Sequence, residues 1–211
     1  MSISTKKLTI MAALTAAALI IFIIEAQIPL PIPVPSVKLG LANTITLFAL
    51  FYGRTGRTFT RSLQGRGYEG GIIEKPSPGK GSGADSKPSH GKSSGAVGLT
   101  TANAFMILAC RIILGAVFTG RIVAFAYSVS GGLLGFAAQA VMKRFVTDKQ
   151  IWACGAVGAV FHNIGQILAA MLVTGTPAIA AYLPILIIAG VATGVTTGFV
   201  AQITLWRLYS P

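Results

Sequence analysis

The stretch FHNIGQ, residues 161–166, holds the densest group of hydrogen-bonding side chains in an otherwise apolar part of the sequence. His162 and Gln166 are four residues apart and would share one face of a helix, with Asn163 beside them. Two interpretations remain open: these side chains line a polar cavity, or they join neighbouring helices by hydrogen bonds. A metal site is not expected, because no carboxylate or thiolate lies near this histidine in the sequence.

Two charged residues, Glu25 and Arg111, belong to long apolar runs. A charge at the middle of a bilayer costs roughly 2.5–3.5 kcal/mol, so each of them needs a partner or a function. One hypothesis is an ion pair between them that joins two helices. The other is that one or both line a polar cavity and contact a ligand.

Residues 25–43 read EAQIPLPIPVPSVKLGLAN and carry prolines at four alternate positions, 29, 31, 33 and 35. Prolines with this spacing exclude a helix and favour an extended, polyproline-like path. Such a path is tolerated at membrane depth only where protein covers it or where it lines a cavity. We therefore expect a stiff external strap between the first two helices. Lys38 and Asn43 follow it at the mouth of the bundle, and a strap over a polar cavity would form a lid.

The elements that position these residues are predicted to be membrane-spanning helices. Hydrophobic residues make up 53% of the 211-residue chain and charged residues only 10%, whereas soluble domains carry about 25% charged residues. Several uncharged runs reach the ~20 residues that a spanning helix needs. The sequence therefore predicts an all-α, polytopic membrane bundle of six transmembrane helices, over residues 8–28, 39–53, 101–119, 122–142, 151–173 and 178–206.

The basic residues predict the orientation of this bundle. The net charge of +12 does not indicate nucleic-acid binding, because no interleaving of aromatic and basic residues suggests stacking on bases. Eight of the seventeen basic residues lie between residues 54 and 92, and most of the others flank apolar runs. Six helices with both termini in the cytoplasm place most of these charges inside, as the positive-inside rule requires.

A polar segment divides the chain into three parts. Helices one and two with the strap occupy residues 1–57, the polar insert occupies 58–98, and helices three to six occupy 99–211. The insert is rich in Gly, Ser and Pro and cannot bury enough apolar surface to fold, so we expect it to be disordered. It is either a native cytoplasmic loop or the product of an altered reading frame.

Small residues recur every four positions in three of the predicted helices. Among glycines the pattern comprises Gly131, Gly135, Gly190, Gly194 and Gly198. In the first helix it comprises Ala12, Ala13, Ala16 and Ala17. This spacing lets helix backbones approach closely. For the glycines it favours packing inside the bundle. For the alanines, packing inside the bundle and docking on another membrane protein are equally compatible with the pattern.

Together these motifs resemble the Gx transporter family, also called heptaprenyl diphosphate synthase component I. The matching pieces are EAQIPLPIPVPSVKLGLAN, RIILG, YSVSGGLL, GAVFHNIGQ, and YLP with the TG repeats that follow. The resemblance covers nearly all of residues 8–206 except the polar segment, where relatives have a short turn. The family is similar to the substrate-binding S components of energy-coupling-factor (ECF) vitamin transporters, six-helix proteins whose first helix docks on a partner through an AxxxA motif.

The resemblance implies a substrate-binding and translocating subunit for a small, vitamin- or isoprenoid-related solute in the prokaryotic inner membrane. ECF-type transmembrane and ATPase subunits would be its partners, docked at the alanines of the first helix. The predicted substrate-binding residues are Glu25, Lys38, Asn43, Arg111, His162, Asn163 and Gln166. Lys38 and Arg111 suggest an anionic ligand. No catalytic residue, metal or cofactor is predicted, and without an ATPase motif active transport would require partner subunits.

An enzymatic role in polyprenyl diphosphate synthesis is the alternative. Prenyl transfer needs clustered carboxylates to hold magnesium and diphosphate. The five acidic residues of the sequence are dispersed: Glu25, Glu69, Glu74, Asp85 and Asp148. The chain by itself is therefore not expected to catalyse this reaction, and the alternative reduces to a non-catalytic membrane component of heptaprenyl diphosphate synthesis.

Overall fold

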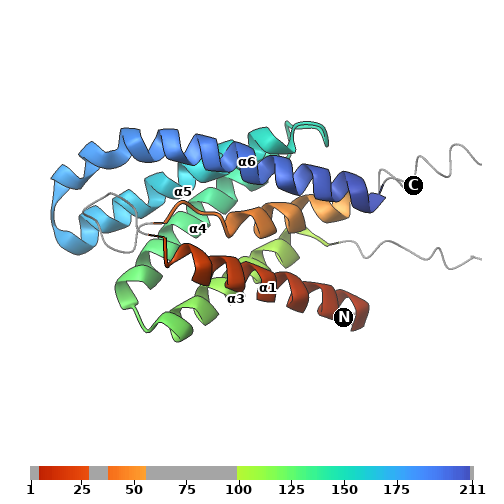
Figure 1. Ribbon diagram of the computed structural model, residues 1–211, viewed down its shortest axis with the longest axis horizontal. Coiled ribbons are helices and arrows are strands. Elements are labelled where there is room, and N and C mark those ends of the chain that lie inside the picture. The colour runs from red at the N-terminus through yellow and green to blue at the C-terminus, as the bar shows by residue number, and fades with distance from the viewer. Residues whose placement is uncertain (1–4, 29–37, 56–98, 210–211) are drawn as a thin grey trace, which may run out of the picture.

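The computed structural model describes residues 5–28, 38–55 and 99–209 of the chain. Over these residues it consists of α-helices in an antiparallel, up-and-down bundle (Figure 1). The long helices are α1 (Thr5–Glu25), α3 (Thr101–Thr119), α4 (Ile122–Met142), α5 (Ile151–Thr174) and α6 (Leu183–Tyr209). A shorter helix spans residues 43–55, and the 3-10 helix η1 (Pro177–Tyr182) precedes α6. The predicted all-α bundle is confirmed.

The helix ends follow from local sequence signals. Gly120 and Gly175 adopt positive φ angles of 61° and 65° and terminate α3 and α5, as glycine commonly does at helix ends because it lacks a Cβ. Pro177 then opens η1, which splits the predicted sixth segment into a 3-10 turn and α6. The second helix begins at residue 43 rather than 39, because residues 38–42 form a turn with Gly40 at a φ of 83°.

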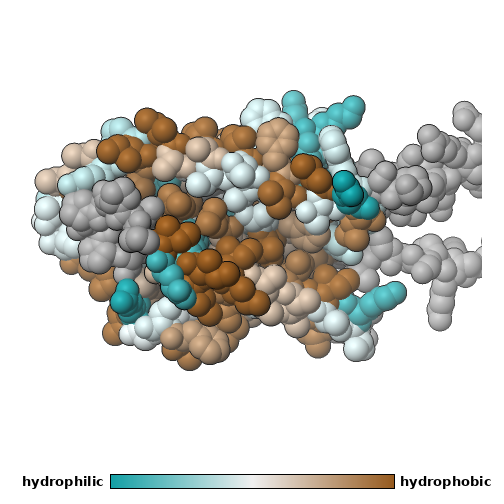
Figure 2. Space-filling model, viewed as in Figure 1, coloured by the Kyte–Doolittle hydropathy of each residue, from teal (hydrophilic) through white to brown (hydrophobic). Residues whose placement is uncertain are grey.

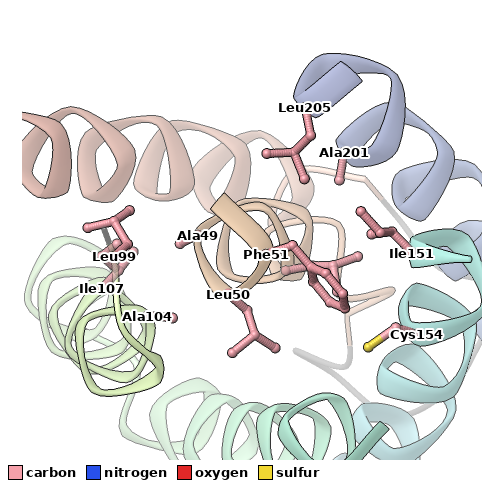
Figure 3. Packing of buried hydrophobic residues seen from close by; sticks show 11 residues of the cluster. Ala49, Leu50, Phe51, Leu99, Ala104, Ile107, Ile151, Cys154, Ala201 and Leu205 are labelled. Carbon is pink, nitrogen blue, oxygen red and sulfur yellow. The ribbon is translucent and has the colours of Figure 1, made fainter. Parts of the chain in front are cut away.

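The helix over residues 43–55 forms the centre of the bundle. Leu47, Ala49, Leu50 and Phe51 on it are at most 1% exposed and pack against buried residues of α3, α5 and α6. Figure 3 shows this helix enclosed by its neighbours. Its 13 residues span only about 20 Å at 1.5 Å per residue, less than the roughly 30 Å hydrocarbon core of a bilayer. None of its residues is exposed. Because neighbouring helices rather than lipid surround it, this helix does not have to match the thickness of the bilayer.

The outer surface of the bundle is apolar. Five segments are long and apolar enough to cross a membrane: α1, α3, α4, α5 and the stretch Pro177–Tyr209. Large hydrophobic side chains such as Leu172, Ile122 and Val117 are 74–85% exposed. Figure 2 shows hydrophobic residues over most of the visible face, with hydrophilic ones mainly toward its two ends. A surface of this kind is stable against lipid rather than water, so the chain is a membrane protein.

The glycine repeats pack inside the bundle, as their spacing predicts. A Cβ on Gly155 of α5 would lie 2.4 Å from the carbonyl oxygen of Gly194, and one on Gly198 would lie 2.6 Å from the Cα of Trp152. Because these neighbours are backbone atoms, α5 and α6 can approach this closely only with glycine at the crossing. On the other side of α5, Gly131 and Gly135 of α4 lie against His162.

The proline strap at residues 29–37 and the insert at residues 58–98 lie outside the described residues, so the predictions made for them stand as predictions. The first helix ends at Glu25, three residues before its predicted end. The described chain continues to residue 28 and resumes at Lys38.

Candidate functional site

A layer of buried polar side chains separates two apolar clusters in the bundle. One cluster surrounds the helix over residues 43–55 and includes Ile151 and Cys154 of α5. The other includes Tyr127 of α4 with Ile167 and Leu186 of α5 and α6. The layer between them contains all seven residues predicted as binding residues, each at most 8% exposed: Glu25, Lys38, Asn43, Arg111, His162, Asn163 and Gln166.

His162 and Gln166 link α5 to the turn that precedes the second helix. Gln166 Nε2 lies 2.6 Å from His162 Nε2, and Gln166 Oε1 accepts a hydrogen bond of 2.8 Å from the backbone amide of Lys38. Because the amide nitrogen of Gln166 can only donate, His162 Nε2 must accept. The hydrogen-bond network thus assigns the histidine proton to Nδ1, which becomes a donor.

Glu25 anchors the same turn from the end of α1. Its Oε1 accepts hydrogen bonds from the backbone amides of Gly40 and Leu41, the latter at 3.1 Å. Hydrogen bonds to an ionised acceptor are about twice as strong as those between neutral groups. The carboxylate therefore fixes the turn over residues 38–42, and with it the positions of Lys38 and Asn43.

Arg111 of α3 contacts the second helix through Asn43. Its Nη2 donates to Asn43 Oδ1 at 3.3 Å, and the residue is only 2% exposed. The ion pair between Glu25 and Arg111, one of the two hypotheses from the sequence, does not form within the described residues, where the salt bridge present joins Arg54 and Asp148 at 2.7 Å. Within the described residues, Arg111 is thus a buried cation with one neutral hydrogen-bond partner, while Glu25 accepts hydrogen bonds from backbone amides.

Lys38 places a second cation in the layer. Its Nζ lies 3.1 Å from the centroid of the Phe22 ring, a cation–π contact. Burial lowers the pKa of the Lys38 ammonium from 10.5 to about 8; the Glu25 carboxylate opposes this shift, and Arg111 and Arg121 add to it. At neutral pH Lys38 still carries its charge, so two cations face one anion. The sequence reasoning missed Phe22, although its place three residues before Glu25 puts it on the same helix face.

Asn163 is directed away from the other residues of the layer. Its Nδ2 donates to the carbonyl oxygen of Leu186 at 2.6 Å and lies 2.5 Å from the position that a Cβ on Gly190 would take. This hydrogen bond joins α5 to α6. The FHNIGQ cluster is therefore divided between two roles, with His162 and Gln166 toward the turn at residues 38–42 and Asn163 toward α6.

Several buried polar atoms of the layer have no hydrogen-bond partner among the described residues, 5–28, 38–55 and 99–209. They are Lys38 Nζ, Asn43 Nδ2, Arg111 Nε, His162 Nδ1 and Asn163 Oδ1. Leaving one such atom unsatisfied costs about 1–3 kcal/mol, more if it is charged. The first four are nitrogen donors. The layer can therefore supply several hydrogen bonds, and a positive charge, to an acceptor-rich group.

Gly40 packs closely against His162, where a side chain would not fit. A Cβ at this position would lie 2.9 Å from His162 Cδ2 and 3.2 Å from Asn43 Nδ2. We expect Gly40→Ala to lower the melting temperature and displace the turn, because the new methyl group meets the imidazole. Gly120→Ala is the matched control, since Gly120 also has a positive φ of 61° but has nothing within 4 Å.

Both substitutions share the backbone strain, about 1–2 kcal/mol for a non-glycine residue in this region. Thermal unfolding in detergent should therefore show a larger loss for Gly40→Ala than for Gly120→Ala. Equal losses would mean that the contact with His162 contributes nothing.

The alanines predicted as a docking motif lie on the outside of α1. Ala12, Ala13 and Ala16 are exposed and Ala17 is partly buried. Ala18, Phe22 and Glu25 form the buried side of the same helix. The alanines thus face outward, where lipid or a partner helix could cover them.

Fold and site together define a helical membrane protein with a buried, donor-rich polar layer beside the turn over residues 38–42. The chain belongs to the heptaprenyl diphosphate synthase component I family, whose family model matches residues 14–63 and 95–204. The residues between the two matched segments fall within the predicted insert. No curated protein and no solved structure matches the chain.

Proposed function

We propose that this protein is the substrate-binding subunit of a membrane transporter for a small anionic solute, similar in role to the S component of an ECF transporter. The observation that carries this proposal is a set of four nitrogen donors that find no hydrogen-bond partner in the described part of the chain, on Lys38, Asn43, Arg111 and His162. They come from three helices and a turn, so one ligand bound among them would hold the bundle and its outer connection together. A carboxylate or phosphate offers the acceptors and the negative charge that they lack.

In this proposal the seven predicted residues divide by role. Lys38, Asn43, Arg111 and His162 contact the ligand. Glu25 and Gln166 position the turn over residues 38–42 through its backbone amides. Asn163 joins α5 to α6. The strap at residues 29–37 connects Glu25 to Lys38 and, as its sequence predicts, would cover the ligand.

The orientation in the membrane follows from the charges at the two ends of the bundle. α1 begins and α6 ends at the same end (Figure 1). That end carries the basic residues Lys6, Lys7, Arg54, Lys143, Arg144, Lys149 and Arg207. The opposite end carries Lys38 and Arg121. By the positive-inside rule the first end faces the cytoplasm of a prokaryotic cell and the polar layer lies toward the outside.

Cysteine labelling in intact cells checks this orientation. In a background without Cys110 and Cys154, Thr176→Cys should react with an impermeant maleimide, and Phe145→Cys should react only after the cells are permeabilised. The reverse pattern would overturn the proposed orientation.

Mass spectrometry of the molecules released from purified protein tests the proposed function. Wild-type protein should release a carboxylate- or phosphate-bearing molecule in a near-stoichiometric amount. His162→Ala should not, because it removes one donor and the van der Waals contact of the imidazole ring. Gln139→Ala is the control, since Gln139 is also buried, at 2% exposure, but is not one of the predicted binding residues. A wild-type protein with no anionic molecule, or full retention by His162→Ala, would contradict the proposal.

The family name favours a second candidate, a non-catalytic membrane component of heptaprenyl diphosphate synthesis. The two acidic residues in the described part of the chain, Glu25 and Asp148, lie at opposite ends of the bundle, which supports a non-catalytic role. Affinity purification from native membranes separates the two candidates. The transporter predicts an ATPase and a second membrane subunit, docked on the alanines of α1, whereas the accessory component predicts a prenyltransferase.

A further inference from the structure

The outside of the bundle has a groove along the seam between α3 and α4. It consists of two adjoining hollows of about 150 Å³ and about 320 Å³, which share Ile113 and Phe125 as lining residues. Its lining runs from Phe105 to Val117 on α3, which corresponds to roughly 18 Å at 1.5 Å per residue. One leaflet contributes about half of the roughly 30 Å hydrocarbon core, so the groove is long enough for a single acyl chain.

The inner wall of this groove separates it from the polar layer. Leu108 and Ile112 line it, and their Cδ1 atoms lie 3.4 Å and 3.0 Å from the position of a Cβ on Gly132 of α4. Arg111 Nη2 lies 3.8 Å from the same position. A chain in the groove would therefore pack on Leu108 and Ile112 and would not reach the unpartnered donors behind them.

Arg121 lines the hollow at the outer end of the groove. It is exposed, and the described residues offer its side chain no ion pair. It also immediately precedes α4, whose first turn contains no acidic residue and whose amino end has no side-chain cap. A phosphate placed there would meet the guanidinium and the positive end of the helix dipole. Every helix begins with unpaired amides, so the helix end alone would not distinguish this site. Arg121 supplies the specific charge, and the helix dipole adds to it.

We propose that this groove binds one molecule of an anionic phospholipid, with an acyl chain between α3 and α4 and the phosphate of its headgroup against Arg121. The charge distinguishes this site from general contact with lipid. An apolar groove alone would accept a chain of any lipid, whereas an unpaired arginine at its end selects a headgroup with net negative charge. The apolar part of the groove is separated from the proposed solute site by Leu108 and Ile112, whereas the charge of Arg121 also acts on Lys38.

Native mass spectrometry of the delipidated full chain tests the proposal with phosphatidylglycerol and phosphatidylcholine of identical acyl chains. Wild-type protein should retain one phosphatidylglycerol in preference to phosphatidylcholine. Arg121→Gln should reduce that preference about fivefold, because one basic residue near an anionic surface contributes about 1 kcal/mol. Arg144→Gln is the matched control, since Arg144 is exposed at the other end of the bundle, and it should leave the preference unchanged.

A second pair of variants tests the chain-binding part of the groove. Ala109→Phe fills the hollow that Ala109 lines and should lower retention of both lipids. Ala192→Phe, on the exposed face of α6, should lower neither. Equal retention of the two lipids by wild-type protein would show that the groove does not select an anionic headgroup, which contradicts the proposal. An unchanged preference in Arg121→Gln would also overturn the proposal.

Discussion

Replacing Arg111 with methionine should preserve or raise the thermal stability of the protein while abolishing retention of its anionic ligand. Arg111 is 2% exposed, and among the described residues its guanidinium makes one hydrogen bond of 3.3 Å to a neutral amide and its Nε finds no partner. A buried charge without an ion-pair partner carries a desolvation cost of several kcal/mol, so an apolar side chain of similar length at this position should be neutral or stabilising. Here Asn43 would lose its partner, so the expected gain lies between zero and about 3 kcal/mol.

The measurement combines thermal unfolding in detergent with mass spectrometry of the released molecules. Arg144→Met serves as the control, because Arg144 is an exposed arginine at the opposite end of the bundle; it should change neither quantity. A melting temperature that falls markedly in Arg111→Met, whether or not ligand is present, would show that the arginine supports the fold. In that case the buried cation would not be a binding group.

Glu25→Gln should have the opposite effect on stability. Glu25 Oε1 accepts the amides of Gly40 and Leu41, and its charge is the negative one beside Lys38 and Arg111. A glutamine can still accept through its carbonyl oxygen, but the charge-assisted part of both bonds is lost. Because a hydrogen bond to a charged group contributes about 1.5–3 kcal/mol, we expect a loss of roughly 2–3 kcal/mol in the free energy of unfolding.

Asp148→Asn provides a matched control for Glu25→Gln. Asp148 is paired with Arg54 at 2.7 Å, but both side chains are 24% exposed. Exposed pairs contribute about 0–1 kcal/mol, so this substitution should cost clearly less. The double variant with Arg111→Met should recover part of the Glu25→Gln loss, because one of the two uncompensated cations is then removed. If Glu25→Gln loses ligand without any loss of stability, Glu25 contacts the ligand directly, as the sequence alone predicted.

The helices could be predicted from the sequence because their signals are local. Long uncharged runs, Gly120, Gly175 and Pro177 set the positions of α3 to α6 to within a few residues. The helix over residues 43–55 was placed correctly in order but not in its start. Its first residue depends on the turn over residues 38–42, whose backbone amides donate hydrogen bonds to Glu25 of α1. Hydrophobic periodicity does not reveal this interaction between residues fifteen positions apart.

The candidate residues could also be recognised from the sequence. A polar side chain in an apolar run costs free energy to place in the membrane, whichever residue it is paired with. All seven prove to be buried. Their partners could not be recognised, because hydrogen bonds depend on direction and on which helices are neighbours. The sequence allowed a Glu25–Arg111 ion pair, whereas the structure pairs Glu25 with backbone amides and Arg111 with Asn43.

The sequence by itself therefore determined the class of protein, the order of the α-helices in the described residues, and the set of costly polar residues, since composition and burial energy act on each segment separately. Only the tertiary structure decided that the short second helix lies at the centre, that Asn163 faces α6 while His162 faces the turn, and that the unpartnered donors share one layer. These features arise from close approach between segments distant in the chain. That approach is set by the glycine contacts between helices, where a single Cβ would meet backbone atoms of the neighbouring helix.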